Sequence, residues 1–200
     1  MDKLNRDIKE YYQQDFLGLD LSQQQIEEVI FENCTFTECN FSDVMVKSCK
    51  FIDCRFIKSN LSNMKILASR FADVCFQESK VIGINWAKAV WPNYSLTTSI
   101  KFQQCIINDS SFFGLTLQEM EIQGCKAHDV DFREGDFAYA NFTDSDFSYS
   151  QFMRTNLDGV DFSNATNYQI DVTLNRVKGA KFSRFEALEL LTSLGIELVD

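Results

Sequence analysis

Seven cysteines and a single histidine are the residues of this chain best suited to metal binding or nucleophilic chemistry. Cys34 and Cys39, like Cys49 and Cys54, are separated by four residues, and the histidine, His128, is distant in the sequence. Zinc needs four ligands that converge tetrahedrally, and this spacing does not supply them. We therefore expect no metal site.

Six of the cysteines lie two residues before an apolar residue of the repeat described below, at a position that otherwise holds small side chains. We expect reduced thiols there that behave as small apolar side chains. The alternative is disulfides between positions 20 residues apart, which could stack closely, such as Cys34 with Cys54 or Cys105 with Cys125. The odd number of cysteines and the lack of a recognisable secretory signal oppose them.

Catalytic groups are scarce. The sequence has no glycine-rich phosphate loop, no nucleophile elbow and no pair of histidines. Asp144 and Asp146 are close in sequence, but they occupy different positions of the repeat described below and need not converge. We expect a protein without catalytic residues and without a cofactor, and therefore not an enzyme.

An apolar residue, most often phenylalanine, recurs at every fifth position, and 17 of the 19 phenylalanines follow this rule. Only Phe113 and Phe185 do not. A period of five matches neither a helix nor a strand, and a sustained short repeat is typical of a solenoid. The two series of central residues are Phe16, Leu21, Ile26, Phe31, Phe36, Phe41, Val46, Phe51, Phe56, Leu61, Ile66, Phe71, Phe76, Val81, Trp86, and Phe102, Ile107, Phe112, Leu117, Ile122, Ala127, Phe132, Phe137, Phe142, Phe147, Phe152, Leu157, Phe162, fading through Val172, Val177 and Phe182.

The residues around each central position predict a corner. The residue two before it is small, the residue directly before it is often Asp or Asn, and the two that follow are mostly polar. Asp and Asn side chains bond to nearby backbone groups and so favour turns. The chain is expected to turn after each short extended piece.

The net charge is −10 and it is uneven. Residues 1–100 carry 13 acidic and 11 basic side chains, and residues 101–200 carry 16 and 8. This balance disfavours nucleic-acid binding and favours a basic partner. With no signal peptide and no long apolar run, we expect a cytoplasmic protein without membrane association.

The repeat resembles the pentapeptide-repeat family, most clearly in Ala140-Asn141-Phe142-Thr143-Asp144 and Ser145-Asp146-Phe147-Ser148-Tyr149. The resemblance implies an all-β, right-handed quadrilateral β-helix of about eight coils, with a short C-terminal α-helix. The expected divisions are an N-terminal cap at 1–14, the β-helix at 15–182, and a capping and dimerisation helix with a short apolar tail at 183–200.

The series slips by one position between Trp86 and Phe102, which predicts one inserted residue and a bulge or short loop near 87–101. Either this insertion is merely tolerated, or it forms a partner-contacting loop. The candidate loop residues are Trp91, Pro92, Asn93 and Tyr94.

The C-terminal segment predicts a helix. Ser183 and Glu186 have the spacing of a capping box, and Gly195 is a stop signal after Leu194. Its apolar residues are numerous enough to plug the last coil alone, or to plug it and form a dimer. The candidate cap and dimer residues are Phe185, Leu188, Leu191, Leu194, Ile196 and Leu198.

The segments around Trp86, Trp91 and Tyr168, and the C-terminal ending, resemble the gyrase-protecting branch of the family, which includes the albicidin-resistance, microcin B17-immunity and Qnr quinolone-resistance proteins. The resemblance implies a homodimeric DNA mimic that binds DNA gyrase or topoisomerase IV and counters a topoisomerase poison. The alternative is a non-enzymatic scaffold for an unrelated protein.

The acidic second half supplies a candidate partner-binding surface. Four of its residues lie directly before a central position, and the corners alone explain them. The other four, Asp129, Glu134, Asp144 and Asp158, are better evidence for a negative electrostatic potential at the surface. The basic residues of the N-terminal coils indicate that any mimicry is confined to the later ones. The candidate surface consists of Asp129, Asp131, Glu134, Asp136, Asp144, Asp146, Asp158 and Asp161.

Overall fold

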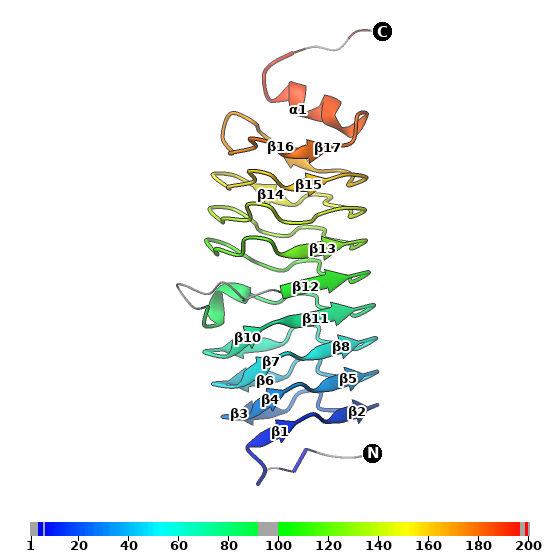
Figure 1. The fold of residues 1–200 in the computed structure, drawn as a ribbon, viewed down its shortest axis with the longest axis vertical. Coiled ribbons are helices and arrows are strands. Elements are labelled where there is room, and N and C mark those ends of the chain that lie inside the picture. The colour runs from blue at the N-terminus through cyan, green and yellow to red at the C-terminus, as the bar shows by residue number, and fades with distance from the viewer. Residues whose placement is uncertain (1–3, 6, 92–99, 197–198, 200) are drawn as a thin grey trace.

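The computed structural model describes residues 4–5, 7–91, 100–196 and 199. These form a rod of stacked coils that rises from the N-terminus to the C-terminus (Figure 1). All paired strands are parallel, and each pairs with the strand one coil above or below. The expected β-solenoid of about eight coils is confirmed.

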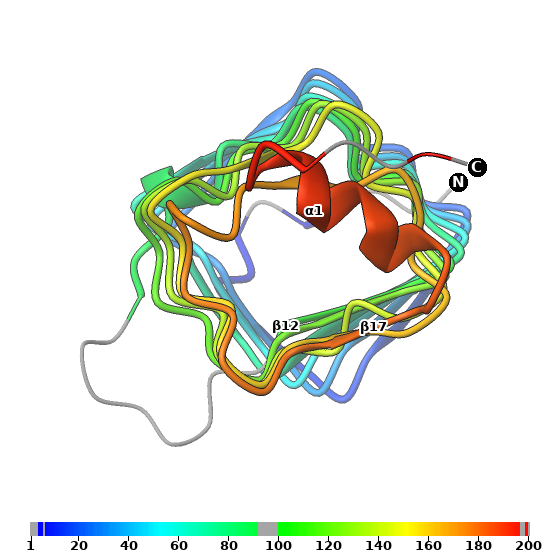
Figure 2. The same cartoon turned by 90° about the horizontal axis from the view of Figure 1, so that it is seen from above.

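Viewed along its axis the rod has a four-sided outline (Figure 2), and we number the sides in chain order. Face 1 carries β1 (Glu10–Tyr12), β4 (Ile30–Glu32), β7 (Lys50–Ile52) and β10 (Arg70–Ala72). Face 2 carries β2 (Asp15–Leu17), β5 (Thr35–Thr37), β8 (Arg55–Ile57), β11 (Val74–Gln77), β12 (Ile100–Gln103), β13 (Glu121–Gln123), β15 (Asp161–Phe162) and β17 (Lys181–Phe182).

Face 3 consists of isolated bridges that run from Asp20 to Thr166. Face 4 carries β3 (Gln25–Glu27), β6 (Met45–Lys47), β9 (Lys65–Leu67), the 3₁₀ helix η1 (Trp86–Lys88), β14 (Gln151–Phe152) and β16 (Gln169–Ile170). Bridges continue faces 1 and 4 through the later coils, where regular strands are short or absent.

The corners are built as the sequence predicts. Asn40 accepts hydrogen bonds from the backbone N–H of Ser42 (3.1 Å) and from its hydroxyl (2.8 Å). Asp43, the residue after Ser42, turns the chain with a φ of 56°. Non-glycine residues with φ between 48° and 63° recur every five positions along the described chain. Such a conformation costs about 1 kcal/mol or more per residue, so the stacking of coils must outweigh it.

Stacked aromatic rings fill the core. On face 2, the ring centroids of Phe16, Phe36, Phe56, Phe76 and Phe102 follow one another at 4.8–5.1 Å with nearly parallel planes. Rings on neighbouring faces meet edge to face, as Phe36 and Phe41 do at 5.2 Å. Both arrangements are favourable for aromatic pairs, at about 0.5–1.5 kcal/mol each beyond burial. The period of five therefore builds continuous ladders.

The small position is buried and hydrogen-bonded between coils. Ser59 Oγ accepts from the backbone N–H of Cys39 and donates to the carbonyl of Phe36 in the coil below, both at 3.0 Å. The Cys54 thiol likewise donates to the Phe31 carbonyl at 3.3 Å. All seven cysteines are free thiols, and six of them are buried. Cysteine and serine are thus interchangeable here because both are small and donate to the same acceptor.

The solenoid begins earlier than the sequence analysis placed it. β1 pairs with β4, and the ring of Tyr11 stacks on Phe31 at 5.3 Å. Residues 10–14 are therefore part of the first coil and not a separate cap. Tyr11 was overlooked because tyrosine departs from the phenylalanine pattern, although it lies on the same series of five.

The slip in the repeat holds six inserted residues, and the prediction of one was wrong. Phe56 pairs with Phe76 and Phe76 pairs with Phe102, so the second interval in the sequence is longer than the first by six. The backbone N–H of Val90 still bonds to Ser69 as in a regular coil, so the insertion lies after Val90. It therefore falls between Trp91 on face 1 and Phe102 on face 2. Six residues and one residue shift a period of five by the same amount.

The repeat also departs from its period near the C-terminus. Ile170 pairs with Phe152 of the coil below. These two residues are closer in the sequence, by two residues, than Val46 and Ile66, which pair in a regular coil. Ile170 is buried at the position that the sequence analysis gave to Val172. The regular separation returns at the next face, because Arg176 pairs with Asn156 at the same sequence separation as in a regular coil. Tyr168 fills the shortened turn, but its buried hydroxyl has no hydrogen-bond partner in the described structure.

The C-terminal segment forms η2 (Glu186–Leu188) and α1 (Glu189–Thr192), which lie across the end of the rod (Figure 2). The predicted capping box is absent. Ser183 Oγ accepts from the backbone N–H of Asn164 at 2.7 Å, and Glu186 accepts from that of Asn167 at 3.3 Å. Both side chains therefore fasten the helix to the last coil. The helix ends at Thr192, two residues before the predicted end at Leu194, and Gly195 follows with a φ of 69°.

The buried hydroxyl of Tyr168 yields a stability prediction. Burial raises the pKa of Tyr168 to about 12, and an unpaired buried hydroxyl costs about 1–3 kcal/mol. We expect Tyr168→Phe to increase the free energy of unfolding by about 1 kcal/mol in urea titrations. The matched control is Tyr149→Phe, because Tyr149 is 71% exposed and should be neutral. A destabilised Tyr168→Phe variant would show that the hydroxyl has a partner.

Candidate protein-binding surface

The structure spreads the eight candidate acidic residues around the rod. Asp131 lies on face 4, Asp146 on face 3, and Asp161 on face 2. Asp136 and Asp158 lie on face 1. Asp129, Glu134 and Asp144 are positive-φ corner residues. The set therefore forms an acidic belt around the sixth to eighth coils and not a stripe along one side.

Four of these carboxylates hold the corners together. Each accepts a hydrogen bond from the backbone N–H two residues later, at 2.9–3.1 Å. These are the residues directly before an inward position, as the sequence analysis expected: Asp131, Asp136, Asp146 and Asp161. Their negative charge is present at the surface, but their placement is explained by folding.

Ion pairs reduce the charge of the belt. Asp131 pairs with Arg133 at 2.8 Å, and Glu134 pairs with Arg154 at 2.5 Å. Asp158 pairs with Arg176. Asp161 pairs with Lys181 at 3.0 Å, and Asp146 contacts His128 at 2.8 Å.

Asp129 and Asp144 differ from the other six. Neither has a cationic partner in the described part of the chain, and neither carboxylate caps a corner. Asp144 accepts only from the side-chain amide of Asn164 at 3.0 Å. These two corner residues carry the negative charge that folding explains least.

Asp146 is the most strongly hydrogen-bonded carboxylate of the belt. Partial burial raises its pKa, but hydrogen bonds from Asn167, Ser148 and His128 outweigh that effect and hold the pKa well below its usual range. Asp131 behaves similarly, since hydrogen bonds from the Arg133 guanidinium lower its pKa. Both therefore remain ionised at neutral pH.

The C-terminal end of the rod exposes apolar side chains. Phe185 is 83% exposed, and Leu188, Leu194 and Ile196 are each about half exposed. Leu190 packs against the core and Leu191 is half-buried. Leu198 lies outside the described residues. The segment therefore has one surface against the last coil and a second surface open to solvent.

The candidate loop is only partly within the described chain. Trp91 packs against the core, with its indole N–H donating to the Trp86 carbonyl at 2.9 Å. It continues the inner column of face 1 and does not point to solvent. Pro92, Asn93 and Tyr94 lie outside the described residues.

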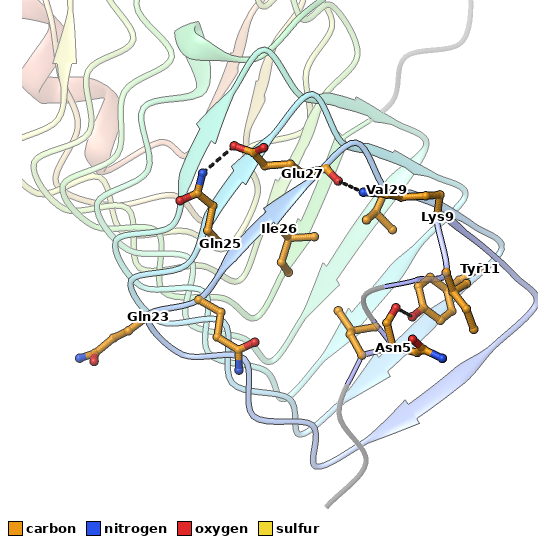
Figure 3. A pocket seen from close by; sticks show the side chains of 11 residues that line it. Asn5, Lys9, Tyr11, Gln23, Gln25, Ile26, Glu27 and Val29 are labelled. Carbon is orange, nitrogen blue, oxygen red and sulfur yellow. Dashed lines mark hydrogen bonds between the residues drawn. The ribbon is translucent and has the colours of Figure 1, made fainter.

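The N-terminal end contains a pocket of about 560 Å³ (Figure 3). Ile26 and Val29 of the first coil line it together with Lys9 and Tyr11 (Figure 3). Lys9 Nζ donates to the Glu27 carbonyl at 3.0 Å. A second, glutamine-lined hollow on face 2 adjoins Asp144. Neither groups residues suited to acid–base catalysis.

Four of the thiols are poor nucleophiles. Burial raises the pKa of the Cys54 thiol to about 12, and it also raises those of Cys34, Cys39 and Cys49.

Among the described residues, no group of three or more His, Cys, Asp or Glu side chains is placed to hold a metal ion. No helix within the described ranges is long and apolar enough to span a membrane.

Face 4 holds surface residues that the sequence analysis did not single out. Phe113 is 41% exposed and Met153 is 36% exposed. The guanidinium of Arg133 lies over the Phe113 ring, 5.7 Å from its centroid. Phe113 was one of the two phenylalanines outside the period of five, and that exception was the signal available in the sequence.

A four-sided parallel solenoid with an inward apolar residue at every fifth position defines the class of protein. The pentapeptide repeat region family matches residues 29–100 and 89–162, and the chain belongs to this family. No curated protein sequence matches the chain.

Two trypsin-treated forms of QnrB1, a plasmid-mediated fluoroquinolone resistance protein, have a similar structure. One has a TM-score of 0.71 and 15% identity and covers 96% of this chain and 100% of its own. The other has a TM-score of 0.71 and 17% identity and covers 94% of this chain and 99% of its own. At this identity the likeness establishes a shared fold.

The low pKa of Asp146 predicts an acid-dependent contribution to stability. A carboxylate with a depressed pKa stabilises the fold above its unfolded value, near 4, and this contribution is lost as the pH falls toward the folded value. We expect Asp146→Asn to lower the free energy of unfolding at pH 7 by about 1 kcal/mol, with the difference shrinking below pH 3. Urea titrations at both pH values measure this, with Asp129→Asn as the control. An equal deficit at both would contradict a charge-dependent role.

Proposed function

We propose that this protein binds DNA gyrase or topoisomerase IV as a DNA mimic and protects the enzyme from a topoisomerase poison such as a quinolone or albicidin. The observation that carries the proposal is a continuous rod whose acidic belt adjoins an exposed apolar end. The shared fold with QnrB1, a fluoroquinolone resistance protein, supports the same assignment. The proposed role is non-enzymatic.

The geometry supports a homodimer joined through the C-terminal segments. Pairing of the exposed Phe185 and Leu188 side chains of two copies would remove apolar surface from water. It would also bring the two acidic belts together at the middle of a longer rod. Residues 101–200 of each copy carry a net charge of −8, and a basic DNA-binding surface would meet that charge near the two-fold axis.

The dimer is tested by the combined variant Phe185→Asp and Leu188→Asp. Both side chains are exposed in the single chain, so the rod should fold normally while the apolar contact is lost. We expect light scattering to report a monomer for the variant and a dimer for the native protein. Leu17→Asp is the control at the opposite end, where Leu17 is 75% exposed. A native protein that is monomeric at high concentration would refute the dimer.

Gyrase binding is tested in supercoiling and cleavage assays with purified enzyme, with and without a quinolone. We expect the native protein to restore supercoiling in the presence of the drug, or to inhibit the enzyme at higher concentration. Absence of both effects at micromolar protein would eliminate the topoisomerase proposal in favour of a scaffold for an unrelated protein.

The electrostatic part is tested by Asp129→Lys combined with Asp144→Lys. These corner carboxylates have no cationic partner in the described structure, and Lys58 already occupies an equivalent corner with a φ of 51°, so lysine fits there. We expect gyrase affinity to fall about tenfold or more, with weaker salt dependence.

The matched control is Glu38→Lys combined with Asp43→Lys. Glu38 and Asp43 occupy the same two corners in the second coil, so the change in net charge and backbone position is identical. If both double variants bind equally well, the acidic belt is not the recognition surface.

A further inference from the structure

The N-terminal end of the rod consists of open strand edges. β1, β2 and β3 are each the last strand of their sheets, and no strand lies beneath them in the described part of the chain. Backbone N–H and carbonyl groups on such an edge can pair with a further strand. The C-terminal end differs, because η2 and α1 lie across it (Figure 2). The N-terminal end is therefore where another chain could continue the stack.

The coil above β3 shows which of its backbone groups are free. The backbone N–H of Glu28, directly after β3, donates to the carbonyl of Lys47 in that coil at 3.0 Å. Bonding groups alternate between the two sides of a strand, so those of Ile26 also face the coil above. The backbone groups of Gln25 and Glu27 therefore point away from the rod.

One of these outward-pointing groups has a partner within the chain. Lys9 Nζ donates to the Glu27 carbonyl at 3.0 Å. The N–H and carbonyl of Gln25 and the N–H of Glu27 have no hydrogen-bond partner in the described structure. Lys9 is exposed, so its ammonium can return to water when a strand takes its place. The edge of β3 thus offers two donors and two acceptors to an added strand.

The N-terminal pocket lies on the same open side of β3. Leu4, Ile8, Tyr11 and Ile26 line its apolar part, and no residue of β6 lines it (Figure 3). Ile26 is 7% exposed there, whereas Val46, its counterpart one coil higher, is fully buried. Ligand pockets usually measure about 300–1,000 Å³, and this one measures about 560 Å³. An apolar side chain of an added strand would therefore complete the core beneath Ile26.

The charge of the first coil favours a strand that carries a basic residue. Residues 1–28 contain seven acidic and three basic side chains. Lys47 of the coil above pairs with Glu27 at 3.5 Å. Glu28, directly after β3, and Glu10, at the start of β1, have no cationic partner in the described structure. A cationic segment would be attracted to this end of the rod.

We propose that the open edge of β3 binds an extended, cationic segment of a partner protein. The segment adds as a parallel strand beneath Gln25–Glu27 and places an apolar side chain in the pocket. Recognition of this kind draws affinity from main-chain hydrogen bonds and specificity from the side-chain pocket. The site lies at the opposite end of the rod from the apolar C-terminal segment, and it does not depend on gyrase binding.

The probe is a fluorescein-labelled peptide with the sequence of residues 60–70 of this chain. It contains β9, a face 4 strand with Ile66 inward, and it has two basic residues and no acidic one. Fluorescence anisotropy measures its binding to the full-length protein. We expect saturable binding with a Kd below about 100 µM, and binding about tenfold weaker for the peptide with Ile66→Asp. Absence of binding by the unmodified peptide overturns the proposal.

Main-chain pairing is tested with two N-methylated forms of this peptide. In a parallel strand beneath β3, the amides of Ile66 and Ala68 would face β3, as the equivalent amides of β3 face β6. Those of Lys65 and Leu67 would face away. Methylation of the first pair should weaken binding about tenfold or more, and methylation of the second pair should leave the Kd within about threefold. Equal effects of the two modifications overturn strand addition.

The edge is located by Gln25→Pro, with Leu17→Pro as the matched control on β2. Both backbone N–H groups point away from the coil above, so proline removes no hydrogen bond of the rod. We expect Gln25→Pro to bind the peptide about tenfold more weakly and Leu17→Pro to bind it within about twofold of the native protein. Circular dichroism verifies that both variants are folded. Equal losses overturn the assignment to β3.

The pocket is tested by Ile8→Ser, a change that the fold should tolerate because Ile8 is 42% exposed. The control is Tyr12→Ser, since Tyr12 is 56% exposed on β1 and does not line the pocket. Affinity for the peptide should fall about threefold or more in the first variant only. Light scattering gives the remaining outcome. A native dimer that is lost in Gln25→Pro would assign this edge to contacts between copies and overturn the assignment to a partner protein.

Discussion

Hydrogen bonds between successive coils are the interaction on which the rest of this structure depends. Each coil must return to the same register after its circuit, because its backbone N–H and carbonyl groups have no other partners in the core. That requirement explains the positive-φ corners, the small residue beneath each corner and the Asx hydrogen bonds. It also explains why the six-residue insertion after Trp91 leaves Phe102 stacked on Phe76.

The same requirement changes the meaning of the acidic residues. Asp131, Asp136, Asp146 and Asp161 serve corners, and most of the belt is also ion-paired. A surface with a negative potential thus arises partly as a by-product of folding. The charges of Asp129 and Asp144 are not explained in this way. A repetitive fold therefore leaves its functional information in positions that depart from the repeat, at corners, ends and the outer surface of single faces.

Different parts of the rod surface differ in chemistry although they share a backbone. The belt around the sixth to eighth coils is acidic, whereas face 4 of the third and fourth coils carries the exposed Leu67 beside Lys65 and Lys88. Outward residues are free to vary because the inward residue and the corner alone maintain the stack. One solenoid can in this way present separate surfaces to different partners, and Phe113 with its covering Arg133 is the clearest example of an outward residue fixed in position.

The sequence by itself determined the core, the corners and the approximate number of coils, because a period of five residues encodes them locally in every repeat. It did not determine the length of the insertion, since one and six residues give the same phase. It also misassigned Ser183 and Glu186, whose partners Asn164 and Asn167 lie in the coil below. Which outward residues share a face was decided only by stacking, because neighbours on the surface are a whole coil apart in the chain and the insertion shifts that count for every later coil.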